Sequence, residues 1–244
     1  MAGAVRIAQP SPADVAAVRL LAPLAVDLMI RCGPFHVPAA VAASAATLEQ
    51  ESSEEAQVTR DFVKQDPYHG MGSVYPGGWM FLARDDDTVV IGRREGRVGL
   101  GAVVQLERRN GAFEAAVMGG WELQMPDAAE RVEACFTAHV EDTTVTLHWT
   151  NDQGLDGAPR RVNPRVELLE GPDDVHFLLH TASAEPRPAE DSWISGTGGP
   201  DATSFELTTP LRDRRLLSDH GIPPDVVTLL PGGHGRRRAR RRRT

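Results

Sequence analysis

The 244 residues of the chain are enough for one large domain or two small ones. Hydrophobic residues make up 41% and charged residues 25%, an ordinary composition for a soluble globular protein, and only two cysteines are present, which excludes a disulfide framework. The net charge is −8, yet seven arginines lie in 236–243, so the rest of the chain is more acidic than the whole.

The N-terminal region shows no clear pattern of a membrane-spanning segment or of a signal peptide. The most apolar early stretch, 15–30, is too short to span a bilayer and is interrupted by Arg19, Pro23 and Asp27. No small-residue cleavage pattern of a signal peptide follows it. The sequence as written therefore predicts a cytoplasmic protein with no membrane span. The alternative is a secreted or lipid-anchored protein whose true start lies upstream.

Residues 1–66 are expected to form a helical N-terminal segment. Ser11 is a good N-cap and Pro12 suits the first helical position, so a helix is predicted to begin there and to run to about Arg31. Pro23 is expected to kink or split this helix, because proline removes a helical hydrogen bond.

A second helix is expected from Pro38 to about Gln65. Its Ala-rich first half is a marginal helix by itself, and its acidic second half is interpreted as a solvated helix face rather than as a binding patch. The Gly-rich stretch 66–78 predicts a loop, and the main boundary of the chain is placed there.

The strongest short-range signal is the dipeptide Asn110-Gly111 between two runs of strand composition. Both residues tolerate positive φ, so they suit the tight turn whose twist matches the flanking strands. Short connections permit only antiparallel pairing, and an antiparallel β-meander is therefore expected over 77–125. Its expected strands are 79–83, 88–93, 98–108 and 113–121. The Asp85-Asp86-Asp87 turn is interpreted as solvated, with calcium binding as the alternative.

A second β region, 130–224, is expected to be a small β-sandwich-like region, because short strands alternate with turn signals at regular spacing. The stretch 182–202 is expected to be a surface loop, 210–224 an irregular closing segment, and 232–244 a disordered Arg-rich tail. The expected strands are 132–140, 143–149, 165–169, 175–181 and 204–208. Together these elements predict an α+β fold.

Three segments resemble a group of actinobacterial proteins: GWMFLARDDDTVVIGR, VVQLERRNGAFEAAVMGGWEL and the ending SFELTTPLRDRRLLSDHGIPP, all within 77–224. Members carry a GWxxLARxDDxV…ERRxG stretch and end in a strand followed by PLGDRxLLDGG. The group is often secreted or lipid-anchored and has a cysteine pair in its second β region, and this chain shows neither feature. Arg212 replaces the glycine that the group has before Asp213. No activity is agreed for the group, so the resemblance implies no catalytic residue.

Three histidines are candidates for a metal site, namely His139, His148 and His176. His139 and His148 lie on adjacent predicted strands and are able to approach each other, and two or three such side chains suffice to begin a zinc site. His176 and His180 share one strand face but are expected about 13 Å apart, at roughly 3.3 Å per residue. The alternative is that these side chains make ordinary hydrogen bonds, which is the preferred interpretation. No catalytic residue and no cofactor is predicted.

The C-terminal arginines are the one compositional extreme of the chain. Such a run is able to neutralise several phosphates and to bind nucleic acid or another anion without sequence preference. The alternatives are a tail that folds back on the acidic body and a tail with no role. The candidate anion-binding residues are Arg236, Arg237, Arg238, Arg240, Arg241, Arg242 and Arg243.

No nucleophile elbow and no phosphate-binding loop occurs in the sequence, so no motif assigns an activity. Abundant predicted sheet without a recognisable site favours a non-enzymatic structural or protein-interaction module. Its partner is unknown, and another protein is the candidate. Two alternatives stay open, a metal-dependent hydrolase that uses the strand histidines and an electrostatic association of the tail with nucleic acid. Cys32 and Cys135 are expected to be free, partly buried thiols.

Overall fold

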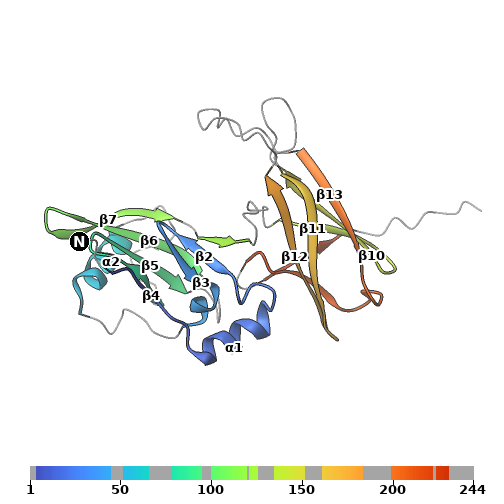
Figure 1. Ribbon diagram of the computed structural model, residues 1–244, viewed down its shortest axis with the longest axis horizontal. Helices are drawn as coiled ribbons and strands as arrows, with labels where there is room; N and C mark the ends of the chain where they lie inside the picture. Colours follow the sequence, from blue (N-terminus) through green and yellow to red (C-terminus); the bar gives the residue numbers. More distant parts are fainter. Residues whose placement is uncertain are drawn as a thin grey trace, which may run out of the picture.

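The protein is described here by a computed structural model of residues 4–44, 52–65, 78–94, 100–119, 121–125, 135–151, 161–183, 199–221 and 224–230 (Figure 1). Its elements, in chain order, are β1 (Arg6–Ile7), α1 (Pro12–Leu21), β2 (Met29–Cys32), β3 (Phe35–Pro38), the 3-10 helix η1 (Ala39–Ala43), α2 (Glu54–Gln65), β4 (Trp79–Arg84), β5 (Thr88–Arg94), β6 (Leu100–Arg109), β7 (Ala112–Gly119), β8 (Glu122–Gln124), β9 (Thr137–Glu141), β10 (Thr144–Asn151), β11 (Arg161–Glu170), β12 (Asp174–Ser183), β13 (Gly199–Glu206), β14 (Arg215–Ser218), β15 (Asp225–Val226) and β16 (Thr228–Leu229).

The fold is mainly β, so the predicted α+β class is wrong. Four sheets account for most of the described residues, against the two α-helices α1 and α2. The two predicted helices were too long. Within the first, α1 ends before Pro23, and residues 29–32 form β2 because β3 and β8 pair with that segment on either side. Within the second, only η1 and α2 are helical.

The N-terminal part is built on a five-stranded sheet of order β1-β4-β5-β6-β7. Its strands β4 to β7 are consecutive and antiparallel, which confirms the predicted meander. Asn110 and Gly111 both have positive φ, +52° and +87°, as the predicted turn between β6 and β7 requires. Asn110-Gly111, the strongest local signal in the sequence, therefore forms the turn of the expected hairpin between β6 and β7.

Alternate residues of this sheet face two different layers. Met80, Leu82 and Val90 pack on one face against α1, η1 and the small sheet β3-β2-β8. Val89 and Ile91 pack on the other face in a layer that includes residues of α2. The sheet therefore lies between two layers. One is formed by α1, η1 and the sheet β3-β2-β8, and the other by α2.

The C-terminal part is a β-sandwich, as predicted for this region. One sheet has the order β13-β10-β9-β16 and the other the order β11-β12-β14-β15. Val145, Leu147 and Trp149 alternate along β10 and meet Phe177 and Leu179 of β12 in a shared core, because successive strand residues point to opposite faces.

The closing segment 210–224 was predicted to be irregular, and this is wrong for the residues that form β14. β14 pairs in parallel with β12, and the chain then continues into β15 and β16, which lie at the edges of the two opposing sheets. A four-residue strand has little periodicity of its own, and its position beside β12 follows from the burial of Leu216 in the sandwich core. The predicted tail 232–244 lies outside the described residues.

The two parts touch along the outer face of β12, and Figure 1 shows them side by side. Leu178 of β12 belongs to the core of the N-terminal part, whereas its neighbours Phe177 and Leu179 belong to the sandwich core. The same strand thus contributes one face to each of two hydrophobic cores.

Candidate functional site

Polar side chains converge at this contact between the two parts, in a set that we call the junction cluster: His176, Ser218, Asp219 and His220. β12 supplies His176, and β14 with the turn after it supplies the other three. The parallel pairing of β12 with β14 places Phe177 opposite Ser218, and the Asp219 N–H then donates to the Phe177 carbonyl at 3.0 Å. The topology of this sheet therefore brings Asp219 beside His176.

The Asp219 carboxylate joins the two parts. One oxygen, Oδ1, lies 2.7 Å from Nδ1 of His176, and the other, Oδ2, accepts a hydrogen bond from the backbone N–H of Leu24 at 2.9 Å. Leu24 lies in the turn after α1, so this bond crosses from the N-terminal part to the sandwich. Asp219 is 0% exposed, and a buried carboxylate is tolerated only when its oxygens are paired in this way.

His220 lies on the sandwich side of the cluster. Its ring packs against Phe136 and Phe177, with ring centroids 4.9 and 6.0 Å apart. Its Nδ1 is 2.8 Å from the Ser218 hydroxyl, and its Nε2 is 3.1 Å from both the backbone nitrogen and the carbonyl oxygen of Leu179. Burial lowers the pKa of His220 to about 4, and the ring is therefore neutral at physiological pH.

Serine, histidine and aspartate are the residue types of a nucleophilic triad, but here they are connected differently. Ser218 contacts His220, whereas the carboxylate of Asp219 contacts the other histidine, His176. Ser218 is 1% exposed, so its hydroxyl has no open path to a substrate. The arrangement satisfies buried polar groups and joins the two parts, and it offers no accessible nucleophile.

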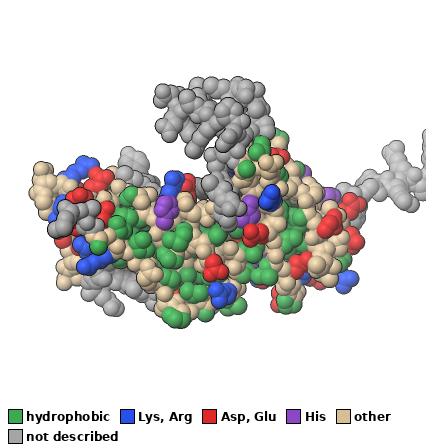
Figure 2. Space-filling model, in the orientation of Figure 1, with side chains coloured by type: hydrophobic (Ala, Val, Ile, Leu, Met, Phe, Trp, Pro, Cys, Tyr) green, Lys and Arg blue, Asp and Glu red, His purple; other side chains and the backbone are tan. Residues whose placement is uncertain are grey.

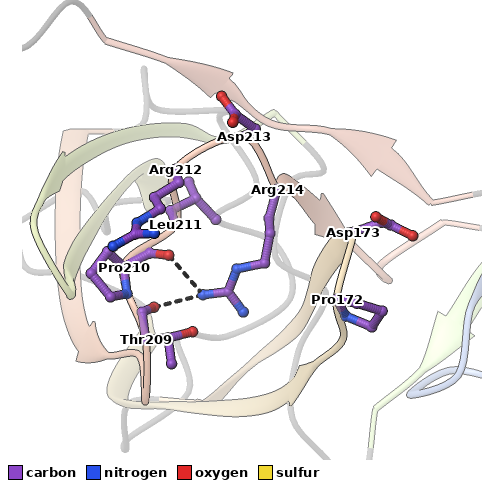
Figure 3. Close-up of a pocket in the computed structure, with 8 residues that line it drawn as sticks. All are labelled: Pro172, Asp173, Thr209, Pro210, Leu211, Arg212, Asp213 and Arg214. Carbon is purple, nitrogen blue, oxygen red and sulfur yellow. Dashed lines mark hydrogen bonds between the residues drawn. The ribbon is translucent and has the colours of Figure 1, made fainter.

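A second candidate is a cavity of about 430 Å³ beside the turn that precedes β14 (Figure 3). Arg214 dominates its wall, with a side chain 12% exposed. Its Nη1 donates to Glu170 and its Nη2 donates to the carbonyls of Thr209 and Pro210, at 2.9, 2.6 and 3.1 Å. The guanidinium group therefore makes its hydrogen bonds within the protein, where it stabilises the turn, and we do not assign it to ligand binding.

Arg214 also sets the electrostatics of this turn. Burial by itself would raise the pKa of Glu170, but hydrogen bonds from the Thr208 N–H and from Arg214 hold it below its usual range. Arg212, in the same turn, has φ of +47°, a left-handed conformation that favours glycine.

The three candidate metal ligands do not come together. His139 on β9 lies opposite Thr146, so it lies diagonally across from His148 of β10 on the outer face of one sheet. His176 lies on the outer face of the other sheet and is paired with Asp219. Within the ranges that the structure describes, no three His, Cys, Asp or Glu side chains form a group able to hold a metal ion.

Asp85 caps its own turn by accepting hydrogen bonds from the N–H groups of Asp87 and Thr88, at 2.9 and 2.7 Å. Both cysteines are free thiols: Cys32 is buried in β2, and Cys135 is exposed before β9. The seven arginines of 236–243 lie outside the described residues.

Sequence reasoning missed Ser218, Asp219 and His220 because the segment around them was predicted to be irregular. The available signal was the apolar pair Leu216-Leu217 directly before them, which is a short strand pattern. No local pattern, however, identifies Leu24 as the partner of Asp219.

Comparison of the chain with protein-family models, with curated protein sequences and with solved structures gives no match. Of the helices in the described ranges, none is at once long and apolar enough to cross a membrane.

Proposed function

We propose that the protein is a non-enzymatic module for protein interaction. The observation that carries the proposal is the apolar surface of α1. Leu20 is 80% exposed and Leu21 is 37% exposed, although an amphipathic helix normally turns its large apolar residues inward. Figure 2 shows hydrophobic side chains gathered in the region of α1 on this face of the molecule. Contiguous exposed apolar surface is typical of a site where another protein binds.

The packing of α1 explains why these leucines face outward. Val15, Val18 and Ala22 lie on one side of the helix and pack into the core of the N-terminal part. Leu20 lies on the opposite side of the helix from these residues, and Leu21 lies on the flank between the two sides, which agrees with their different exposures. They contribute little to folding in this arrangement, which leaves their apolar surface free for a partner.

The junction cluster supports the non-enzymatic aspect of the proposal. Its most reactive residue types are buried and bonded to one another and to the backbone. They account for the attachment of the two parts without any catalytic role. A hydrolase based on the same residues would need Ser218 or His176 to be open to a substrate, and both are buried.

Binding experiments with two matched variants test the proposal. Proteins that co-purify with the full chain are identified, purified and titrated against wild type, Leu20→Arg and Leu169→Arg. Leu169 is another exposed leucine, 46% exposed on β11, and serves as the control. We expect a partner that loses about tenfold or more in affinity with Leu20→Arg only, because a charge enters an apolar contact. Partners that bind all three proteins equally, or hydrolytic turnover that Ser218→Ala abolishes, would contradict it.

A further inference from the structure

A cavity of about 230 Å³ lies between β1, β4, β5 and the start of α2. Phe81, Val89 and Ile91 give it an apolar floor. α2 packs over β6 and β7 and touches β4 through its first turn. The helix therefore leaves the part of the sheet face near β1 open, and the cavity forms there.

The wall of this cavity carries two guanidinium groups and one carboxylate. Arg6 of β1 lies directly opposite Arg84 of β4 in the antiparallel ladder, and like charges in that position repel each other. Glu55 of α2 pairs with Arg84, with 3.2 Å between Oε1 and Nη1. No described residue forms an ion pair with Arg6. The cavity wall thus has one uncompensated positive charge.

We propose that this cavity binds a small organic monocarboxylate, with the carboxylate between Arg6 and Arg84 and the hydrocarbon on Phe81, Val89 and Ile91. An anion in this position relieves the repulsion between the two arginines, and the guanidinium fork is suited to carboxylate oxygens. Typical pockets for drug-sized ligands measure about 300–1,000 Å³, so a smaller cavity selects a small molecule. This inference is independent of the proposed protein interaction.

Hexanoate is a suitable probe because it combines one carboxylate with a short apolar chain. The isotope-labelled full chain is titrated with hexanoate and followed by amide chemical shifts. We expect saturable shifts at residues of β1, β4, β5 and the first turn of α2. Hexanol, which lacks the charge, and acetate, which lacks the chain, are each expected to bind about tenfold more weakly or worse. Sodium chloride at equal ionic strength controls for general screening and is expected to leave these shifts unchanged.

Two arginine variants separate the site from a general anion effect. Arg6→Gln removes the uncompensated charge, and Arg165→Gln removes an exposed strand arginine in the sandwich. We expect hexanoate to raise the melting temperature of wild type and of Arg165→Gln but not that of Arg6→Gln, since a ligand stabilises only the folded state that binds it. Without ligand, Arg6→Gln is expected to be as stable as wild type or more so, which shows that it folds. Equal binding of hexanoate and acetate, equal responses of all three proteins, or no saturable shift would each overturn the proposal.

Discussion

His176 and Asp219 lie 2.7 Å apart, Nδ1 to Oδ1, in a contact where both residues are buried. The same carboxylate accepts the Leu24 N–H from the other part of the molecule. We therefore expect Asp219→Ala to reduce the free energy of unfolding by about 3 kcal/mol, because it leaves a buried histidine and a partly buried N–H unpaired. Asp219→Asn keeps one acceptor oxygen, so its free energy of unfolding should fall by less. Urea unfolding measures both, and Asp173→Ala, at an exposed turn residue, is the control with an expected change below about 0.5 kcal/mol.

The titration of His220 should be visible in the pH dependence of stability. Its pKa is about 4 in the folded protein because of burial, whereas an unfolded histidine titrates near 6.5. Between these values only the unfolded chain takes up the proton. The free energy of unfolding should therefore fall as the pH falls through this window, by up to about 1.4 kcal/mol per pH unit.

His220→Gln removes this titration, so its stability should depend less on pH between 6.5 and 4 than that of wild type. His148→Gln, on the outer face of the sandwich, is expected to follow the wild-type curve. Denaturant unfolding at several pH values gives the comparison. Parallel curves for wild type and His220→Gln would show that His220 is not buried in its neutral form.

Arg212 adopts a left-handed backbone conformation, with φ of +47°. Glycine enters this region without a Cβ penalty, so we expect Arg212→Gly to raise the free energy of unfolding by about 0.5 kcal/mol after the greater freedom of the unfolded chain is deducted. Asp213→Gly is the matched control, because Asp213 is not among the positive-φ residues and gains nothing from glycine. A melting temperature that is higher for Arg212→Gly and lower for Asp213→Gly agrees with this account. The reverse order contradicts it.

Arg214 and Arg215 are neighbours with very different environments. Arg214 donates to a carboxylate and several carbonyls and is 12% exposed, whereas Arg215 pairs with Asp174 and is 62% exposed. Lysine cannot reproduce the guanidinium fork, so Arg214→Lys should cost about 2 kcal/mol. Arg215→Lys should cost less than about 1 kcal/mol, as exposed ion pairs contribute little. Equal losses in chemical denaturation would argue against the role assigned to Arg214.

The two cysteines should differ in reactivity. Burial raises the pKa of the Cys32 thiol to about 12, and Cys135 is exposed. The thiolate is the reactive form, so a thiol reagent at mildly alkaline pH should modify Cys135 quickly and Cys32 only after unfolding. Mass spectrometry of the native and the denatured protein locates the label. Rapid modification of Cys32 in the native protein would show that β2 opens locally.

Features that depend on a few adjacent residues were determined by the sequence. Ser11 and Asp14 cap α1 reciprocally, and Asn110-Gly111 forms its turn, because capping and positive φ are local properties of the chain. The alternation of apolar and polar residues along β10 likewise predicted which face of that strand is buried. These features need no knowledge of distant segments.

Tertiary structure alone decided which segments meet. Residues 29–32 were predicted as the end of a helix but are a strand, because β3 and β8 offer backbone partners on both sides. The parallel pairing of β14 with β12 and the bond from Leu24 to Asp219 join segments far apart in the chain. Such pairings depend on the total surface that is buried and on the polar groups that then need partners, and neither quantity is contained in a local pattern.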